Sequence, residues 1–334
     1  MYVLGIETSC DETSVSVVRD GREVLSNKIS SSLKLHKKYG GVVPEIASRM
    51  QLESLSEISD ASIREAGIKL KKIDLISVTS GPGLAGSLLV GVSFAKALSL
   101  VTGKPLIGVN HLYSHIYANF LNAKGVRLPF IALVVSGGHT SLFRVRDFDK
   151  IETLGETCDD ACGEAFDKVA KILSLGYPGG PFIERLAKKG NPKKIRFNCS
   201  GARQPLDFSF SGIKTAVLYY VKKHSYQRLA TSDQRLKSDI AASFQESVVD
   251  TLIDKSLLAC RLKKINRLVI GGGVAANNRL RVKFHTAAKE RGINYYFPPG
   301  ELCTDNAAMV AGFAYRLFRK GRRSDLYLDM QLAQ

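Results

Sequence analysis

Residues 130–145 read FIALVVSGGHTSLFRV, and this stretch decides the fold that we expect. A continuous apolar run ends in a Ser-Gly-Gly-His turn, and a second run returns as its partner, a pattern that predicts a β-hairpin. Residues 2–18, YVLGIETSCDETSVSVV, predict a second hairpin whose tip carries hydroxyls and carboxylates. Two hairpins of one kind indicate two related lobes, each presenting a polar tip to a shared cleft.

The composition is that of a globular α/β protein. The chain has 334 residues, of which 45% are hydrophobic and 24% are charged. Because single hydrophobic cores stop growing beyond about 250–300 residues, this length favours two lobes.

Two glycine-rich turns each follow an apolar strand and precede a helix. The first, residues 80–87, reads SGPGLAGS, and free N–H groups at the following helix start are compatible with an anion site. It lacks the Walker lysine and the dinucleotide-binding glycine spacing. The second, residues 271–277, reads GGGVAAN, where glycines let a ring lie against the backbone and Asn277 offers a donor and an acceptor. We interpret the second turn as a nucleoside pocket.

A pair of histidines, His111 and His115, stands four residues apart in a chain that has six histidines. On a helix their Cβ atoms would lie about 5–6 Å apart, which suits one metal ion. Imidazole binds zinc, copper, iron or nickel, and further ligands must come from elsewhere. Asp305 precedes a helix expected over residues 306–320, where it is either an N-cap or an oxygen ligand. Two plain surface histidines are the alternative.

The net charge of +17 predicts a polyanionic partner, since a small-molecule enzyme does not need such self-repulsion. The cations gather in patches: Lys34, Lys37 and Lys38; Lys188, Lys189, Lys193, Lys194 and Arg196; Lys222 and Lys223; Arg316, Arg319, Lys320, Arg322 and Arg323. Each patch alone is typical of a solvated face, but together they favour nucleic acid bound by backbone charge and shape.

The remaining features place the protein in the cytoplasm. The six cysteines include no Cys-x-x-Cys pair and are expected to be reduced. The chain opens directly on a strand pattern, which leaves no room for a targeting segment. The most apolar stretch, residues 84–101, contains Lys96, serines and glycines, so we expect a buried helix and no membrane span.

Six segments together resemble the universal tRNA threonylcarbamoyltransferase family, whose bacterial members are the TsaD proteins. They are residues 5–13 (GIETSCDET), 111–115 (HLYSH), 136–140 (SGGHT), 163–168 (GEAFDK), 271–277 (GGGVAAN) and 303–306 (CTDN). The match is collinear over nearly the whole chain, so it is far more specific than any single motif.

The resemblance implies a two-lobed actin-like ATPase (ASKHA) fold with a nucleotide cleft between the lobes. The first lobe would comprise residues 1–110 and 306–334, and the second residues 111–305. It also implies the reaction, in which the N(6) amine of adenosine 37 in tRNAs reading ANN codons attacks threonylcarbamoyl-AMP and releases AMP. A TsaB-like paralogous subunit and a TsaE-like ATPase are the implied partners.

The resemblance also implies the site residues. His111, His115 and Asp305 match the ligands of one divalent metal ion per subunit, with Fe²⁺ favoured and Zn²⁺ the alternative. The stretch that touches the adenylate phosphate and its acyl group comprises Val134, Val135, Ser136, Gly137 and Gly138. The ribose and adenine contacts are Asp167, Gly180 and Asn277, with Glu184 as an added ribose contact.

Asp11 matches an acidic residue proposed to assist proton removal, and Glu12 is the neighbouring candidate. A carboxylate that accepts the proton of a weakly nucleophilic aromatic amine contributes about 10²–10⁴ in rate. A mixed anhydride already carries a good leaving group, so no serine or cysteine nucleophile is needed.

Three other functions compete with this one. A zinc metallopeptidase of the O-sialoglycoprotein endopeptidase type needs His-Glu-x-x-His, but here the glutamate position is Leu112. Some relatives carry an acidic residue between the two histidines, where this chain has Leu112, Tyr113 and Ser114. How the residues around the metal ligands tune the metal is therefore left open. An ATP-hydrolysing or kinase-like enzyme would share the adenine pocket. A tRNA-binding scaffold without catalysis would leave the cleft motifs without a purpose.

Overall fold

The computed structural model describes residues 1–122, 125–225 and 234–331. The backbone forms two compact units, Met1–Val126 with Pro298–Gln334, and Arg127–Phe297. The sequence-based division at residues 110 and 305 differs from these bounds. In the structure, His111, His115 and Asp305 all belong to the first unit, because the helix that carries the histidines packs against the C-terminal helix of that unit.

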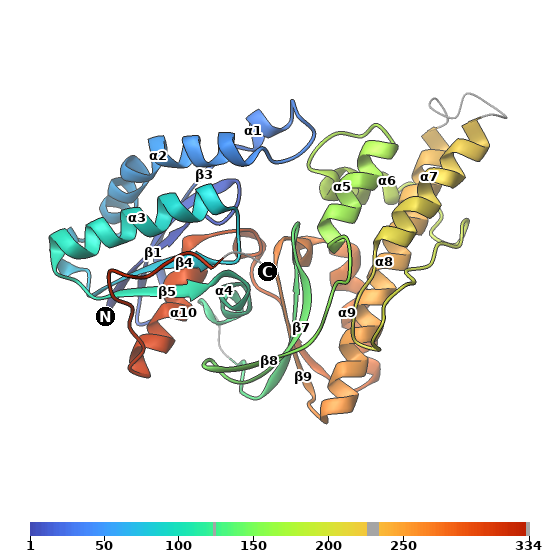
Figure 1. Cartoon of the computed structure of the whole chain (residues 1–334). Coiled ribbons are helices and arrows are strands. Elements are labelled where there is room, and N and C mark those ends of the chain that lie inside the picture. Colours follow the sequence, from blue (N-terminus) through green and yellow to red (C-terminus); the bar gives the residue numbers. More distant parts are fainter. Residues whose placement is uncertain (123–124, 226–233, 332–334) are drawn as a thin grey trace. The chain divides into compact units, whose positions relative to one another are not determined.

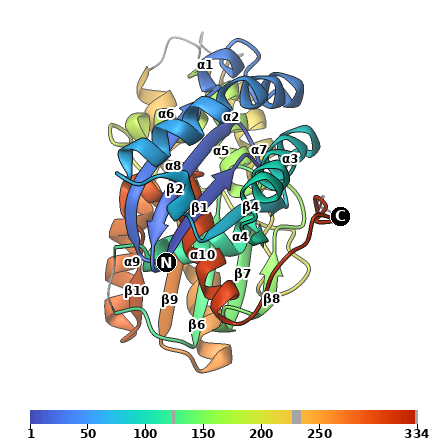
Figure 2. The same cartoon turned by 90° about the vertical axis from the view of Figure 1, so that its left-hand side faces the viewer.

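The first unit is built on a five-stranded sheet of order β3-β2-β1-β4-β5 (Figure 1). Its strands are β1 (Tyr2–Glu7), β2 (Glu12–Arg19), β3 (Glu23–Ser31), β4 (Leu75–Gly81) and β5 (Leu106–Asn110). Its helices are α1 (Leu33–His36), α2 (Pro44–Glu65), α3 (Ala85–Thr102), α4 (His111–Tyr117) and α10 (Ala307–Arg319), with short 3₁₀ helices at Leu70–Lys72, Ala118–Phe120 and Gly300–Leu302. Helices α2 and α3 cover one face of the sheet, and α10 crosses the other (Figure 2).

The second unit contains a five-stranded sheet of order β10-β9-β6-β7-β8. Its strands are β6 (Phe130–Val135), β7 (Thr140–Asp147), β8 (Lys150–Glu156), β9 (Arg267–Gly271) and β10 (Asn294–Tyr296). Its helices are α5 (Cys162–Ile172), α6 (Gly179–Ala187), α7 (Ser211–Ser225), α8 (Gln234–Lys263) and α9 (Asn278–Glu290), with a 3₁₀ turn at Gly273–Ala276.

The two sheets share one topology. In each, a central strand pairs antiparallel with the next strand of the chain and parallel with a later one: β1 with β2 and β4, and β6 with β7 and β9. The register sets Glu7 opposite Ser14 and Val135 opposite Thr140. Both predicted hairpins and the α/β class are therefore confirmed.

Helix α3 differs from its prediction as a buried helix. Only one face is buried, and Leu89, Leu100 and Val101 are exposed. Among the described residues, this is the helix long and apolar enough to cross a membrane, with 28% of it buried; by itself this is weak evidence, because a core helix passes the same test.

Helix α2 begins at Pro44, its first helical residue. Proline is well suited to the first helical position, because its missing N–H would have no partner there. Pro44 therefore favours the start of the helix at this residue.

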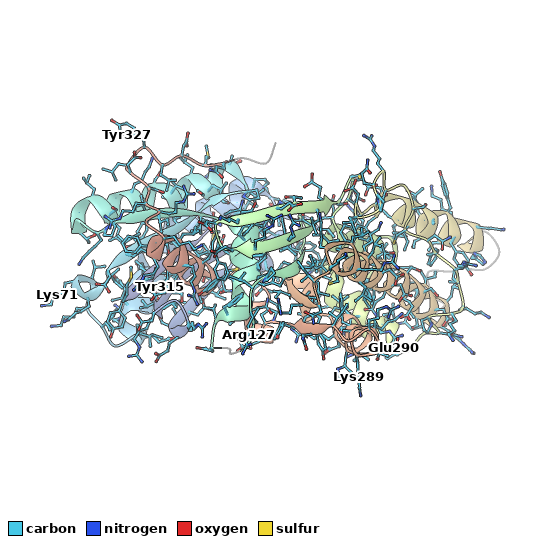
Figure 3. The ribbon with its side chains drawn as sticks, turned by 90° about the horizontal axis from the view of Figure 1, so that it is seen from below. Lys71, Arg127, Lys289, Glu290, Tyr315 and Tyr327 are labelled. Carbon is cyan, nitrogen blue, oxygen red and sulfur yellow. The ribbon has the colours of Figure 1, made fainter. Side chains whose placement is uncertain are left out.

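The basic surface is visible on both units. Lys71 of the first unit and Lys289 of the second project outward (Figure 3). In the basic patch at residues 188–196, Lys188, Lys189, Lys193, Lys194 and Arg196 are all exposed.

Candidate metal centre and nucleotide site

Helix α4 positions the two histidines. It begins directly after β5, and the side chain of Asn110 caps it by accepting a hydrogen bond from the Tyr113 N–H at 3.1 Å. The cap fixes His111 as the first helical residue, and His115 follows one turn later on the same face.

The loop before α10 presents Asp305. The N-cap of α10 is Asn306, whose Oδ1 accepts from the Met309 N–H at 3.0 Å while its Nδ2 donates to the Thr304 carbonyl at 2.8 Å. Asp305 is therefore not the N-cap, and its carboxylate turns instead toward the histidines.

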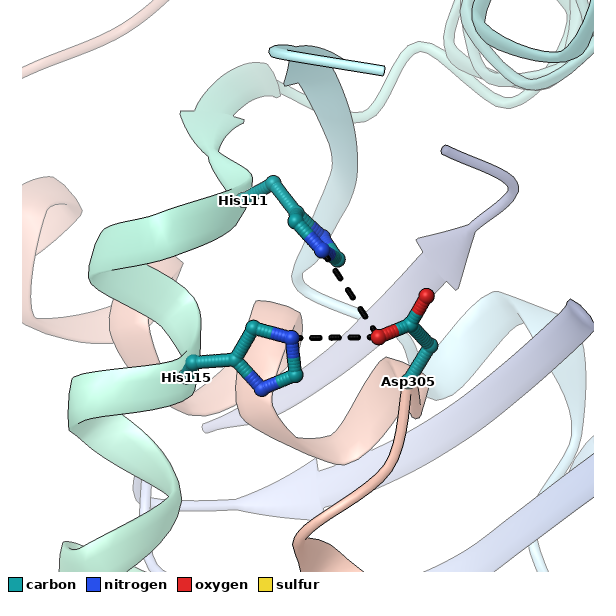
Figure 4. A group of neighbouring side chains, drawn as sticks. All are labelled: His111, His115 and Asp305. Carbon is teal, nitrogen blue, oxygen red and sulfur yellow. Dashed lines mark hydrogen bonds and ion pairs between the residues drawn. The ribbon is translucent and has the colours of Figure 1, made fainter. Parts of the chain in front are cut away.

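His111, His115 and Asp305 form a compact group in the first unit (Figure 4). The Nε2 of His115 lies 3.1 Å from Asp305 Oδ1, and the Nε2 of His111 lies 3.6 Å from the same oxygen. The three ligand atoms lie within 4.8 Å of one another. The imidazole rings meet edge to face, with centroids 4.6 Å apart.

The group is buried and charged. The side chains of His111 and His115 are 7% and 0% exposed, and that of Asp305 is 19% exposed. Burial by itself disfavours the imidazolium of His111, but the charges of Glu7 and Asp305 outweigh it and raise the His111 pKa to about 9. The two carboxylates therefore favour the imidazolium form of His111.

The donor set fits a divalent transition metal. Two imidazole nitrogens and one carboxylate oxygen are a combination that iron and zinc accept, and three protein ligands leave a position for a substrate. Leu112 stands where a metallopeptidase would carry its general base, and an alkyl side chain cannot move a proton. The geometry therefore agrees with a divalent metal that does not serve a zincin-type hydrolysis.

The hairpin tip of the first unit carries Asp11 and Glu12. The backbone carbonyl of Asp11 accepts from the Ser32 hydroxyl at 2.7 Å, and Glu12 Oε1 accepts from the Ser31 hydroxyl at 2.8 Å. Burial raises the pKa of Glu12 to about 7, with smaller contributions from the charges of Asp11 and Asp305. The buried Glu12 Oε2 has no hydrogen-bond partner among the residues that the structure describes.

In the second unit, the predicted phosphate stretch lies against the start of α5. The N–H of Gly163 donates to the Ser136 carbonyl at 3.0 Å, and that of Glu164 donates to the Gly137 carbonyl at 3.1 Å. A Cβ at Gly163 would meet the Ser136 carbonyl oxygen and the Cα and N atoms of Gly137, so the approach requires glycine. Gly137 and Gly138 face open space, since a Cβ added at either glycine would meet no described atom within 4 Å.

Asp167 and Gly180 lie on neighbouring helices of the same unit. Asp167 Oδ1 accepts from the Gly179 N–H at 2.6 Å and so ties the middle of α5 to the start of α6. A Cβ at Gly180 would meet no described atom within 4 Å. This junction leaves room for a ligand beside the α6 start.

Asn277 caps α9 by accepting from the Leu280 N–H at 3.0 Å, and its Nδ2 donates to Gln245 Oε1 at 2.9 Å. Gln245 on α8 is therefore a partner of this site that sequence reasoning missed, because nothing in α8 marks it. Glu184 Oε1 accepts from the Asn278 side chain at 2.8 Å.

A cavity of about 320 Å³ lies beside these residues. It is lined by Glu184, Gln245, Asn278 and Arg279, among others. The predicted nucleotide residues thus belong to one unit, joined by contacts among the β6–β7 tip, α5, α6, α8 and α9.

The glycine turn after β4 packs against two other parts of the chain. The Leu84 N–H donates to the Ser9 carbonyl at 2.8 Å, and the Gln331 N–H donates to the Ser80 carbonyl at 2.6 Å. A Cβ at Gly83 would meet Ser9, and one at Gly81 would meet Gln331. The chain itself fills this turn, and residue 331 is too distant in sequence for the pattern to reveal it.

Glu7 is a further residue missed by sequence reasoning. It is 0% exposed and lies 3.1 Å from the Nδ1 of His111. Burial by itself raises the pKa of Glu7, but the charge and the hydrogen bond of His111 outweigh burial, so the Glu7 pKa is lowered. A carboxylate that ends an apolar strand is a signal that could have found it, because a buried charge needs a partner.

Solved structures with a similar fold define the class. Component A of the (R)-2-hydroxyglutaryl-CoA dehydratase of Acidaminococcus fermentans matches with a TM-score of 0.54 at 18% identity, over 95% of this chain and 98% of its own. Full-length HypF matches with a TM-score of 0.61 at 14% identity, over 96% of this chain and 46% of that longer chain. The protein is an α/β protein of the actin-like fold, and its first unit holds a His-His-Asp group.

The chain belongs to the TsaD family of tRNA N6-adenosine threonylcarbamoyltransferases, whose family model matches residues 23–312. A protein of that name from Thermodesulfovibrio yellowstonii is 54% identical over 329 residues, which are 98% of each chain. Another from Clostridium botulinum strain Hall is 51% identical over 328 residues, 98% of this chain and 95% of its own. The resemblance, the transferase function and the enzyme class predicted from the sequence are confirmed over the peptidase and kinase-like alternatives.

Proposed function

We propose that this protein transfers the L-threonylcarbamoyl group of threonylcarbamoyl-AMP to the N(6) amine of adenosine 37 in tRNAs reading ANN codons and releases AMP. The observation that carries the proposal is the convergence of His111, His115 and Asp305 within 4.8 Å, in a chain of this family. The separate pocket residues of the second unit supply the nucleotide contacts.

His111, His115 and Asp305 would hold one divalent metal ion, with Fe²⁺ favoured and Zn²⁺ the alternative. A bound ion would supply Lewis-acid polarisation and a template for the charged groups of the substrate. The capped start of α4 and the Asn306 cap of α10 position the three side chains that would hold the ion.

The second unit would hold the adenylate. The open glycines of the tip Val134–Gly138 let backbone approach the phosphate and the acyl group, and the start of α6 at Gly180 leaves room for the nucleoside. Asp167 would accept from the ribose hydroxyls, Asn277 would contact the base, and Glu184 would add a ribose contact. Gln245 would orient the Asn277 amide through its hydrogen bond of 2.9 Å.

The amine must lose a proton when it attacks the carbonyl carbon. Asp11 and Glu12 are the candidate bases, and Glu12 is the better supported. Its pKa of about 7 lies near the working pH, where general-base catalysis is most efficient, and burial is the main cause of that value. The N(6) proton would pass to the carboxylate of Glu12 or Asp11, and AMP would leave with the electron pair of the broken anhydride bond.

The tRNA would lie on the basic surface, for which the net charge of +17 provides the general attraction. The patch at residues 188–196 supports a phosphate contact because its backbone is pinned to α8. The Asn191 N–H donates to Asp239 at 2.7 Å, and the Ile195 N–H donates to the Ser243 hydroxyl at 3.2 Å. The lysines between these anchors are held on a fixed backbone.

A TsaB-like paralogous subunit and a TsaE-like ATPase are the protein partners that we propose, and the cytoplasm is the proposed location. The exposed face of α3 supports a partner subunit. Leu89 and Leu100 are 53% and 68% exposed, and eleven residues make close to three helical turns, so both project from one side.

The test is tRNA modification by the purified protein supplied with threonylcarbamoyl-AMP, tRNA and the partner proteins. We expect wild-type protein to modify the tRNA, and His111→Ala, His115→Ala and Asp305→Ala to lose that activity. His285→Ala is the matched control, since His285 is an exposed histidine that pairs with Tyr295. Full activity in all three variants, or robust peptide cleavage by the wild type, would contradict the proposal.

A further inference from the structure

Glu7 ends the central strand β1 and is completely buried. Its carboxylate is surrounded by hydrogen-bond donors from three places in the chain. Oε1 accepts from the Ser9 N–H at 2.6 Å, and Oε2 accepts from the Thr79 hydroxyl at 2.6 Å. Oε2 also lies 3.1 Å from the Nδ1 of His111. A buried carboxylate with such donors is fixed in position, because every movement would break a hydrogen bond in a dry environment.

This arrangement determines which nitrogen of His111 carries a proton. A carboxylate that already receives two donors has only acceptor positions to offer, so the close approach of Nδ1 requires a proton on Nδ1. The hydroxyl of Ser9, 3.1 Å from the same nitrogen, can share that proton. Nε2 is then the nitrogen that can bind a metal, and it is also the one that faces Asp305.

His115 provides an internal comparison. Its Nε2 faces the same Asp305 oxygen at 3.1 Å, but its buried Nδ1 has no hydrogen-bond partner among the described residues. Of the two histidines, His111 is thus the one whose Nδ1 lies against a carboxylate. Such outer carboxylates orient the ring and raise the basicity of the ligating nitrogen.

We propose that Glu7 is the positioning residue of the metal centre: its carboxylate holds His111 with the proton on Nδ1, so that Nε2 binds the metal ion. The inference rests on the proposed metal centre and extends it to a residue on another strand. Glu7 is not one of the three candidate ligands and would act through His111.

The experiment measures the affinity of the metal-free full-length protein for Zn²⁺ alone, by competition with a chelating dye. In Glu7→Gln the side chain keeps its shape, but an NH₂ group replaces one carboxylate oxygen. This new donor must face either the Ser9 N–H or the groups of Thr79 and His111, where an acceptor is needed. We expect Zn²⁺ binding to weaken about 10–100-fold, the usual effect of losing such a partner. Thr79→Val, which removes one donor to Glu7 without touching a histidine, is expected to weaken it less.

Ser77→Ala is the matched control for lost stability. Ser77 is buried on β4, and its hydroxyl donates to the Leu4 carbonyl at 2.9 Å without contact to the metal group. It should lower the thermal midpoint and leave Zn²⁺ affinity unchanged. Nitrogen-15 NMR of the Zn²⁺-loaded wild type should place the His111 proton on Nδ1.

The inference is overturned if folded Glu7→Gln and Thr79→Val both bind Zn²⁺ like wild type while His111→Ala does not, or if NMR finds the His111 proton on Nε2. Failure of the proposed metal centre itself would look different, because His111→Ala would then also bind Zn²⁺ like wild type.

Discussion

The two units carry the same sheet topology and differ in what lies at the ends of their central strands. In the first unit, the turn after β4 is filled by Ser9 and Gln331, and the strand ends carry buried side chains that meet a metal-type group. In the second unit, the equivalent turn after β9 and the tip after β6 leave Gly273 and Gly137 facing open space. One sheet topology therefore carries two kinds of strand end, one lined by side chains and one by exposed backbone.

The largest expected effect comes from separating these two sites. Asp305→Ala should abolish metal binding and leave affinity for AMP unchanged, because Asp305 lies in the first unit. Gly180→Val should block AMP and leave metal content unchanged, since it adds a side chain where no described atom lies within 4 Å. Metal analysis and calorimetric titration with AMP measure both. If each variant lost both ligands, the assignment of one site to each unit would be wrong.

The filled and open turns predict opposite responses to one added methyl group. Gly83→Ala would place its Cβ 2.5 Å from the Ser9 carbonyl oxygen, and such overpacking typically costs about 1–3 kcal/mol. Gly273→Ala meets no described atom within 4 Å, so its unfolding free energy should stay within about 0.5 kcal/mol of wild type. Urea denaturation of the metal-free proteins compares them. Equal destabilisation would show that the two turns do not differ as described.

The hairpin tip of the first unit also predicts a pH dependence. The pKa of Glu12 rises from 4.5 to about 7, so the folded state binds this proton more tightly than the unfolded state does. The resulting stability is fully present below pH 4.5 and is lost as the pH rises through about 7. Glu12→Gln cannot ionise, so at a pH of about 8.5 its thermal midpoint should be about 1–3 °C higher than that of the wild type. The difference in thermal midpoint should vanish at a pH of about 4. A difference that is the same at every pH would argue against a buried Glu12 with a raised pKa.

The smallest expected effect concerns the basic surface of the second unit. Replacing Lys193 and Lys194 together with glutamate should weaken tRNA binding several-fold and reduce its salt dependence by about one unit per lysine. Lys71→Glu with Lys72→Glu is the matched control on the first unit. Fluorescence titration at several salt concentrations measures the tRNA affinity of both double variants. Equal losses of affinity would contradict the assignment of a tRNA contact to the patch at residues 188–196.

Local patterns predicted much of this fold. Both hairpins and the two glycine turns followed from apolar runs and spacing. The roles of Glu7 and Gln331 did not, because each depends on a partner many residues away: Glu7 meets Thr79 and His111, and Gln331 fills a turn at Ser80. The exposed face of α3 was missed for a different reason, since apolar composition does not reveal which face packs.

The metal content of protein purified without a histidine tag tests the central claim most directly. We predict about one iron or zinc ion per chain in the wild type and none in the variant that combines His111→Ala, His115→Ala and Asp305→Ala. A wild type that holds no transition metal after anaerobic purification and reloading, or a triple variant that keeps its metal, would contradict the account.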